Sequence, residues 1–144
     1  FAADPSREEK NYPLAQEAVR LMGRDDAMLL PVHGVPHDSM PLYYNASDVM
    51  ILTSLWEGSV NSVKEAMACN LPVVSTDVGD VRVNTSGVDG YFITTPDAAA
   101  MAEKLREAFD LKVPVKGRER ITGLQLDSAS VARRLIEIYN SVNS

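Results

Sequence analysis

The sequence predicts an α/β domain in which a parallel sheet of about five strands carries helices on both faces. Short apolar segments alternate along the chain with longer segments whose apolar residues recur every three or four positions. Strands give the first pattern and amphipathic helices give the second. The apolar run at 49–53 is continuous, as expected for a strand covered on both faces. These observations indicate a Rossmann-like arrangement, in which ligands bind at the carboxyl ends of the strands.

The strand candidates are short, and loops separate them from the helices. In order, the predicted strands are Phe1–Ala3 (the end of a buried strand), Ala27–Val32, Val49–Thr53, Pro72–Thr76 and Tyr91–Thr94. The loops after the first three strands are 7–10, 33–36 and 57–61. Parallel strands end on the same side of a sheet, so these three loops should meet at one edge.

Helices are predicted between the strands. The one at 12–22 carries apolar residues on a single face, at Leu14, Ala18, Leu21 and Met22. Gly23 suits its carboxyl-terminal stop, because glycine readily adopts the left-handed conformation found there. A short helix begins at Asp38 or Ser39, and another covers Val63–Cys69.

The last third of the chain is predicted to be mainly helical. Thr95 is expected to cap a helix with Pro96 at its first position. The buried stripe of that helix is Met101, Leu105 and Ala108. A short helix is predicted at Gly117–Ile121, and Asp127 or Ser128 caps the final one. The apolar stripe of the final helix is Val131, Leu135, Ile138 and Val142. We expect it to pack on this domain's own sheet or on a second copy, and to be less secure than the other helices.

Composition narrows the class of protein. A chain of 144 residues corresponds to about one domain. The net charge of −6 and the pI near 4.8 argue against a nucleic-acid binder, which usually presents a basic face. One cysteine, and no signal-peptide or membrane-span pattern, predict a cytoplasmic location, with peripheral attachment at the inner face of the membrane left open. Phe1 opens inside an apparent strand, so we expect residues 1–144 to be a fragment of a longer protein.

The segment 55–69 stands out chemically. It reads as a strand end, a tight turn with Gly58 and small or polar residues, and then a helix. The first amides of a helix lack internal partners and favour anions, so such a turn can hold a phosphate. Glu57 and Glu65 bracket this turn. Phosphate-binding amides beside carboxylates suit a ligand that carries both phosphates and hydroxyls, such as a sugar nucleotide.

The motifs in this region resemble a known family. Glu57 and Glu65 are separated by seven residues and followed by Ala66–Thr76, with Tyr44–Val49 before them and Asp77–Asp80 after. This succession resembles the carboxyl-terminal donor domain of retaining GT-B glycosyltransferases of family 4. The resemblance covers nearly the whole chain and is strongest between Gly34 and Gly90. The runs 10–15 and 32–36 resemble bacterial exopolysaccharide and teichuronic-acid-type enzymes.

The resemblance implies roles for individual residues. Glu57 would lie beside the donor sugar, Arg7 and Lys10 would stabilise the leaving diphosphate, and Glu65 would accept hydrogen bonds from the ribose hydroxyls. The residues that would offer backbone groups to the diphosphate, sugar or base are Gly58, Ser59, Val60, Asn61, Gly34 and Val35. Two cations near the departing phosphates would do the work of a metal, so no metal and no cofactor are expected beside a UDP- or GDP-sugar.

Each motif also has a structural interpretation. Ser62 and Glu65 match the pattern of a capping box, in which the glutamate only secures the start of its helix. Glu57 could end a strand in water. Arg7 and Lys10 could belong to a solvated loop beside Glu8 and Glu9.

Two positions depart from the family pattern. Many members carry Phe-Gly or Phe-Pro after the Glu-Gly pair, where this chain has Ser59-Val60. A common spacing places an arginine five residues before the lysine, where this chain has Pro5. Arg7 stands three residues before Lys10 instead. The preferred sugar therefore stays open.

The sequence thus predicts that residues 1–144 form the donor-binding half of a two-domain enzyme. The whole enzyme would transfer a hexose from a nucleotide sugar to a polysaccharide or glycolipid acceptor, and an amino-terminal acceptor domain is missing here. The donor domain alone should be inactive. The alternative is a non-catalytic module of Rossmann-like fold that binds phosphate or nucleotide. A Rossmann dehydrogenase would need Gly-x-Gly-x-x-Gly after the first strand, and the chain has no such run.

Overall fold

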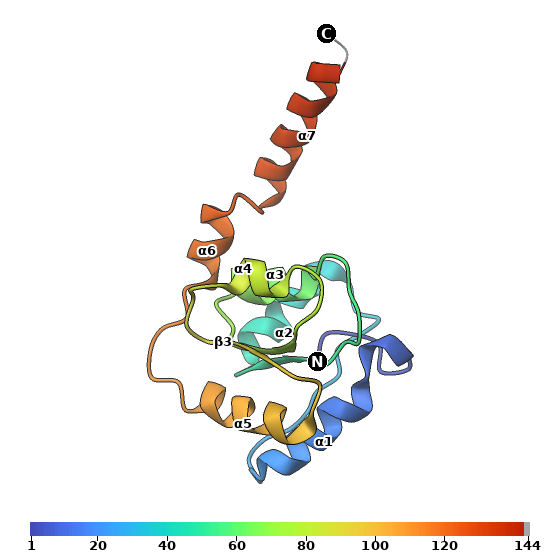
Figure 1. The fold of residues 1–144 in the computed structure, drawn as a ribbon, viewed down its shortest axis with the longest axis vertical. Coiled ribbons are helices and arrows are strands. Elements are labelled where there is room, and N and C mark those ends of the chain that lie inside the picture. Colours follow the sequence, from blue (N-terminus) through green and yellow to red (C-terminus); the bar gives the residue numbers. More distant parts are fainter. Residues whose placement is uncertain (143–144) are drawn as a thin grey trace.

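The computed structural model describes residues 1–142, and its centre is a sheet of three parallel strands between two layers of helices (Figure 1). The strands are β1 (Met50–Leu52), β2 (Val73–Thr76) and β3 (Tyr91–Thr94), adjacent in that order. Ile51 pairs with Val74, and Val74 pairs with Phe92. The predicted α/β class with a parallel sheet is confirmed, although the described strands number three and not about five.

The first two predicted strands are extended segments that fall short of strand pairing. The Val32 N–H donates to the Phe1 carbonyl at 2.8 Å, and the Phe1 amino group donates to the Leu30 carbonyl at 3.1 Å. Two bonds do not make a ladder, and Pro31 near the end of the second segment has no N–H to add. The loop after the first segment still meets the end of β1, where the Leu55 N–H donates to the Glu9 carbonyl.

Alternating side chains of the strands build one core on each face of the sheet. Met50, Leu52 and Val73 belong to one cluster, and Ile51 and Val74 belong to the other. Successive residues of a strand point to opposite faces, so a continuous apolar strand supplies both cores. This arrangement explains why β1 and β2 are fully buried.

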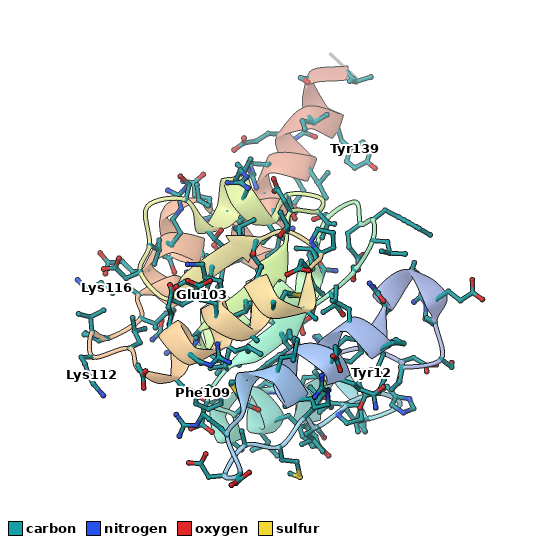
Figure 2. The ribbon with its side chains drawn as sticks, turned by 60° about the horizontal axis from the view of Figure 1, so that its bottom comes forward. Tyr12, Glu103, Phe109, Lys112, Lys116 and Tyr139 are labelled. Atoms are coloured by element: carbon teal, nitrogen blue, oxygen red, sulfur yellow. The ribbon has the colours of Figure 1, made fainter. Side chains whose placement is uncertain are left out.

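Two helices cover one face of the sheet side by side, α1 (Tyr12–Met22) and α5 (Ala98–Phe109) (Figures 1 and 2). The predicted bounds of α1 are confirmed, and Gly23 ends the helix in the left-handed conformation. The predicted stripe of α5 is buried. The Arg106 guanidinium on α5 donates to the carbonyls of Leu21 and Met22. It thereby satisfies carbonyls at the end of α1 that have no partner within the helix.

The start of α5 differs from the prediction. The cap is Asp97 and not Thr95, because the Asp97 carboxylate accepts from the Ala100 N–H at 2.8 Å. Pro96 stands before the helix, where the Thr95 carbonyl accepts from the Asp97 N–H. Aspartate is as good a cap as threonine or better, which explains why the helix begins two residues later.

The other face carries the short helices. They are η2 (His37–Ser39), α2 (Met40–Ala46), α3 (Asn61–Ala68), α4 (Val81–Thr85) and α6 (Gly117–Gly123); a further short helix, η1 (Glu8–Lys10), precedes α1. Arginines fasten α6 to this layer. Arg118 donates to the Ala68 carbonyl at the end of α3, and Arg120 donates to the Val83 and Asn84 carbonyls of α4.

The final helix, α7 (Ser128–Val142), leaves the body of the domain (Figure 1). The Asp127 carboxylate accepts from the Ser130 N–H and caps the helix. Asp127 is one of the two caps that the sequence predicted. Of the two surfaces predicted to cover its apolar stripe, this domain's own sheet is ruled out, and packing on a second copy stays a prediction. Leu135 is 50% exposed and Val142 is 78% exposed, and Figure 2 shows Tyr139 projecting from α7 well away from the sheet. No helix within residues 1–142 combines the length and apolar character needed to cross a bilayer.

Candidate functional site

Hydrogen bonds join the end of β1 to the loop that precedes α1, and they fix the position of the Lys10 backbone. The Leu55 N–H donates to the Glu9 carbonyl at 2.8 Å. The hydroxyl of Thr53, which is fully buried, lies 2.8 Å from the Lys10 carbonyl and 3.0 Å from that of Asn11. Asn11 adopts a left-handed backbone, which asparagine tolerates better than most residues. The two loops are therefore held together at the carboxyl edge of the sheet.

Lys10 and Glu57 form an ion pair at that edge. The Lys10 Nζ lies 2.5 Å from Glu57 Oε1, and both side chains are more than four-fifths buried. The Ser54 hydroxyl donates to the same oxygen at 2.8 Å. Within residues 1–142, the hydrogen bonds to this carboxylate all reach Oε1. Oε2 of Glu57 is thus left without a hydrogen bond from these residues.

The turn after Glu57 is held by Asp80, which follows β2. Asp80 accepts from the Val60 N–H and the Ser59 hydroxyl, each at 2.9 Å, and from the Lys64 ammonium at 2.8 Å. Burial alone would raise the pKa of Asp80, but hydrogen bonds from Lys64, Val60 and Ser59 outweigh it and hold the pKa at about 2. The Val60 amide, which we predicted to face the ligand, is thus engaged by a carboxylate of the protein itself.

We call the contacts of Asp80 with Ser59, Val60 and Lys64 the Asp80 clamp. The clamp should make the stability of the fold sensitive to acid. The folded pKa of Asp80 is about 2 and its ordinary value is 3.8, so its stabilising contribution is present above pH 4 and is lost as the pH falls toward 2. We expect Asp80→Asn to melt at a lower temperature than the parent at about pH 6, and the gap to close toward about pH 2. Thermal melts of both proteins across this range test the expectation. A gap that stays constant with pH would show that the carboxylate charge is irrelevant.

Gly79 brings the Asp80 loop against the turn. Its φ is +54°, and a Cβ added there would lie 2.3 Å from the Gly58 carbonyl oxygen and 3.3 Å from that of Glu57. The two loops touch backbone to backbone, which only glycine permits. The position of Glu57 thus depends on Gly79.

A cavity of about 300 Å³ opens between the segment that precedes α1 and the turn that follows Glu57. Its lining comes from the two loops and the first residues of α3: Ala2, Ala3, Asp4, Arg7, Lys10, Glu57, Ser59, Val60, Asn61 and Ser62. Arg7 is mostly exposed and pairs with Glu9. The structure therefore brings six predicted site residues to one cavity. Gly58, Gly34 and Val35 are not part of its lining, and Gly34 is an exposed residue with a φ of +67°.

Glu65 lies further along α3, outside this lining. Its Oε2 accepts from the Tyr44 hydroxyl at 2.9 Å, and its Oε1 lies 3.9 Å from His37 Nδ1. The capping-box interpretation is wrong, because α3 begins after Val60 and has no side-chain cap. The carboxylate that could have secured the helix start points instead to α2.

Sequence reasoning missed Ser54, Lys64 and Tyr44 as parts of this site. The Asp77–Asp80 motif indicated that Asp80 orders a loop at this edge, but its bond to the Val60 amide depends on a contact between two loops that the motif does not show. Tyr44 opens the Tyr44–Val49 motif. Nothing in that motif shows that its hydroxyl meets a glutamate 21 residues away.

Comparison with known proteins identifies the family. Residues 7–110, more than half of the chain, match the family described as Glycosyl transferases group 1. The "lipopolysaccharide core biosynthesis mannosyltransferase" of Rhizobium meliloti is 36% identical over 114 residues, which are 74% of this chain and 32% of that protein. The N,N'-diacetylbacillosaminyl-diphospho-undecaprenol alpha-1,3-N-acetylgalactosaminyltransferase of Campylobacter jejuni is 31% identical over 113 residues, which are 76% of this chain and 30% of that protein.

A solved structure supports the fold. Sucrose-phosphate synthase from Thermosynechococcus elongatus matches 98% of this chain and 37% of its own, with a TM-score of 0.73 and 23% identity. The predicted GT-B fold is thereby confirmed. The chain spans about a third of the length of the curated relatives it matches. By its sequence, the chain belongs to the Glycosyl transferases group 1 family.

Proposed function

We propose that the chain binds a UDP- or GDP-sugar as the donor half of a retaining, family 4 glycosyltransferase. The observation that carries this proposal is the cavity at the carboxyl edge of the sheet, where Lys10, Arg7 and Glu57 meet residues 59–61. Cations, a carboxylate and small polar residues gather there in a chain of a glycosyltransferase family. This is the chemistry that a ligand with phosphates and sugar hydroxyls requires.

Lys10 and Arg7 would bind the diphosphate. In this structure Glu57 holds the Lys10 ammonium, so an arriving phosphate oxygen would share or take over that ammonium. Hydrogen bonds between charged groups are roughly twice as strong as neutral ones. Placed at the leaving group, these two cations would stabilise the charge that develops as the sugar departs. The proposal therefore needs no metal ion.

Glu57 would bind the sugar of the donor. Its Oε2 can accept a sugar hydroxyl while Oε1 stays with Ser54. A fixed negative charge beside the sugar also stabilises positive charge on the anomeric carbon in an oxocarbenium-like transition state. Glu65 would accept from the ribose hydroxyls, since a carboxylate can serve neighbouring hydroxyls. Gly58, Ser59 and Asn61 would face the diphosphate or sugar.

The base would lie against the 33–36 loop, through the backbone of Gly34 and Val35. This loop leads directly into η2, whose His37 lies beside Glu65. Ribose and base are covalently joined, so the protein groups that bind the ribose must lie close to those that bind the base. Adjacency of the 33–36 loop and Glu65 supports this arrangement.

The whole protein would transfer a hexose to a polysaccharide or glycolipid acceptor in the cytoplasm or at the inner face of the membrane. The names of the two relatives, a mannosyltransferase and an N-acetylgalactosaminyltransferase, favour hexose donors. The remaining two thirds of such a protein would include the acceptor domain. Alone, the chain should bind the donor without transferring the sugar, because one half of a cleft can neither align an acceptor nor exclude water.

Titration of a lysine variant tests the diphosphate site. Lys10→Ala should weaken the binding of UDP or GDP about tenfold or more, because it removes a charge-assisted hydrogen bond of about 1.5–3 kcal/mol. Binding of the monophosphates should fall less. Lys104→Ala is the matched control, since Lys104 also forms an ion pair with a glutamate, but on α5. Equal affinities of the parent and both variants would refute the assignment.

A further inference from the structure

Tyr44 is a buried aromatic residue whose hydroxyl serves the candidate site. Its ring is 4% exposed and packs in the core cluster that contains Val63 and Met67 of α3. The hydroxyl donates to Glu65 Oε2 at 2.9 Å. A close-packed core fixes a ring in one orientation, so the direction of this donor is set before any ligand arrives.

The hydroxyl keeps its proton under all ordinary conditions. Burial of the ring, together with the negative charge of Glu65, raises the pKa of Tyr44 far above its usual value. Tyr44 is therefore a permanent donor to the carboxylate. It cannot become a second negative charge that would repel Glu65.

The two carboxylate oxygens of Glu65 consequently differ. Oε2 is anchored by Tyr44, whereas Oε1 accepts no hydrogen bond from residues 1–142 and lies 3.9 Å from Nδ1 of the exposed His37 ring, beyond hydrogen-bond length. The Glu65 side chain is 32% exposed, so part of it is open to a ligand. A free glutamate side chain on a helix surface would lose considerable rotamer entropy on binding. The Glu65 side chain, which Tyr44 anchors, has already lost much of this entropy before a ligand binds.

We propose that Tyr44 is a positioning residue that holds Glu65 so that Oε1 receives the ribose hydroxyls of the nucleotide. This inference rests on the proposed function, since it takes the ribose as the partner of Glu65. A purely structural bond between α2 and α3 would make a different prediction. Its removal would lower stability without affecting the discrimination between ribose and deoxyribose.

The test is Tyr44→Phe, which removes the hydroxyl and keeps the ring in the core. UDP or GDP should bind about three- to tenfold more weakly to this variant, as expected for one lost hydrogen bond. The 2′-deoxy nucleotide should change little. The ratio of ribo to deoxy affinity should therefore shrink. Tyr43→Phe is the matched control, because Tyr43 lies next to Tyr44 on α2 and its hydroxyl does not bond to Glu65.

A double variant makes the test specific. Tyr44→Phe added to Glu65→Ala should cause no further loss of ribonucleotide affinity, because residues that act through one another are not additive. A folded Tyr44→Phe protein with an unchanged ribo-to-deoxy ratio would overturn the inference while leaving the proposed function intact. A parent chain that binds neither UDP nor GDP would overturn both.

Discussion

Replacement of Glu65 by alanine should weaken the binding of UDP or GDP about ten- to a hundredfold, because hydrogen bonds to a charged group contribute about 1.5–3 kcal/mol. The parent chain should also prefer the ribonucleotide to its 2′-deoxy form, and this preference should nearly vanish in the variant. Titration calorimetry with both forms measures the effect. The Tyr44 hydroxyl occupies Oε2, so we attribute most of the loss to Oε1.

Stability provides the control for this experiment. Glu65 does not cap its helix. The melting temperature should therefore fall only by the amount that the lost hydrogen bond to Tyr44 accounts for. Glu103→Ala serves as a matched variant, since Glu103 is an exposed glutamate of α5 (Figure 2). A Glu65→Ala protein that melts several degrees lower but binds nucleotides as tightly as the parent would contradict the ribose role.

Gly79→Ala should destabilise the domain by about 2–4 kcal/mol, the combined scale of a left-handed alanine and of overpacking. Its new methyl group would lie within 2.3 Å of the Gly58 carbonyl oxygen, so one of the two loops must move. Because that movement displaces the Glu57–Asn61 turn, nucleotide affinity should fall as well. Urea unfolding gives the stability and calorimetry gives the affinity.

A second glycine separates backbone strain from the collision. Gly87 has a φ of +75° and nothing within 4 Å of an added Cβ. Gly87→Ala should therefore show only the strain, about 1 kcal/mol, and leave nucleotide binding unchanged. If the two variants proved equally stable, the close contact of the Gly79 and Gly58 backbones would not determine the stability of this region.

Local patterns predicted most of the architecture. The bounds of α1 and β3, the stripe of α5 and the Asp127 cap depend on apolar spacing and capping chemistry, which are visible within a few residues. The meeting of Lys10 and Glu57 was also predictable, because parallel strands bring their following loops to one edge.

Contacts between distant segments were not predictable in this way. The capping-box pattern at Ser62–Glu65 was sound locally, but a buried tyrosine of α2 offers Glu65 a donor that the pattern cannot show. The Asp80 clamp likewise depends on loops that Gly79 lets approach. The stripe of α7 has the spacing of a packed helix, yet α7 extends away from the sheet, and spacing alone does not say which surface will cover a helix.

The most direct test of the account is calorimetric titration of the unaltered chain with UDP, GDP and NAD. The account predicts that one of the two nucleoside diphosphates binds at a single site, that added metal is not required, and that NAD binds far more weakly. Binding should decrease with salt, because the diphosphate contacts are ionic. Absence of binding by both UDP and GDP at millimolar concentration, or equal binding of NAD, would contradict the central claim that this chain is a nucleotide-sugar donor domain.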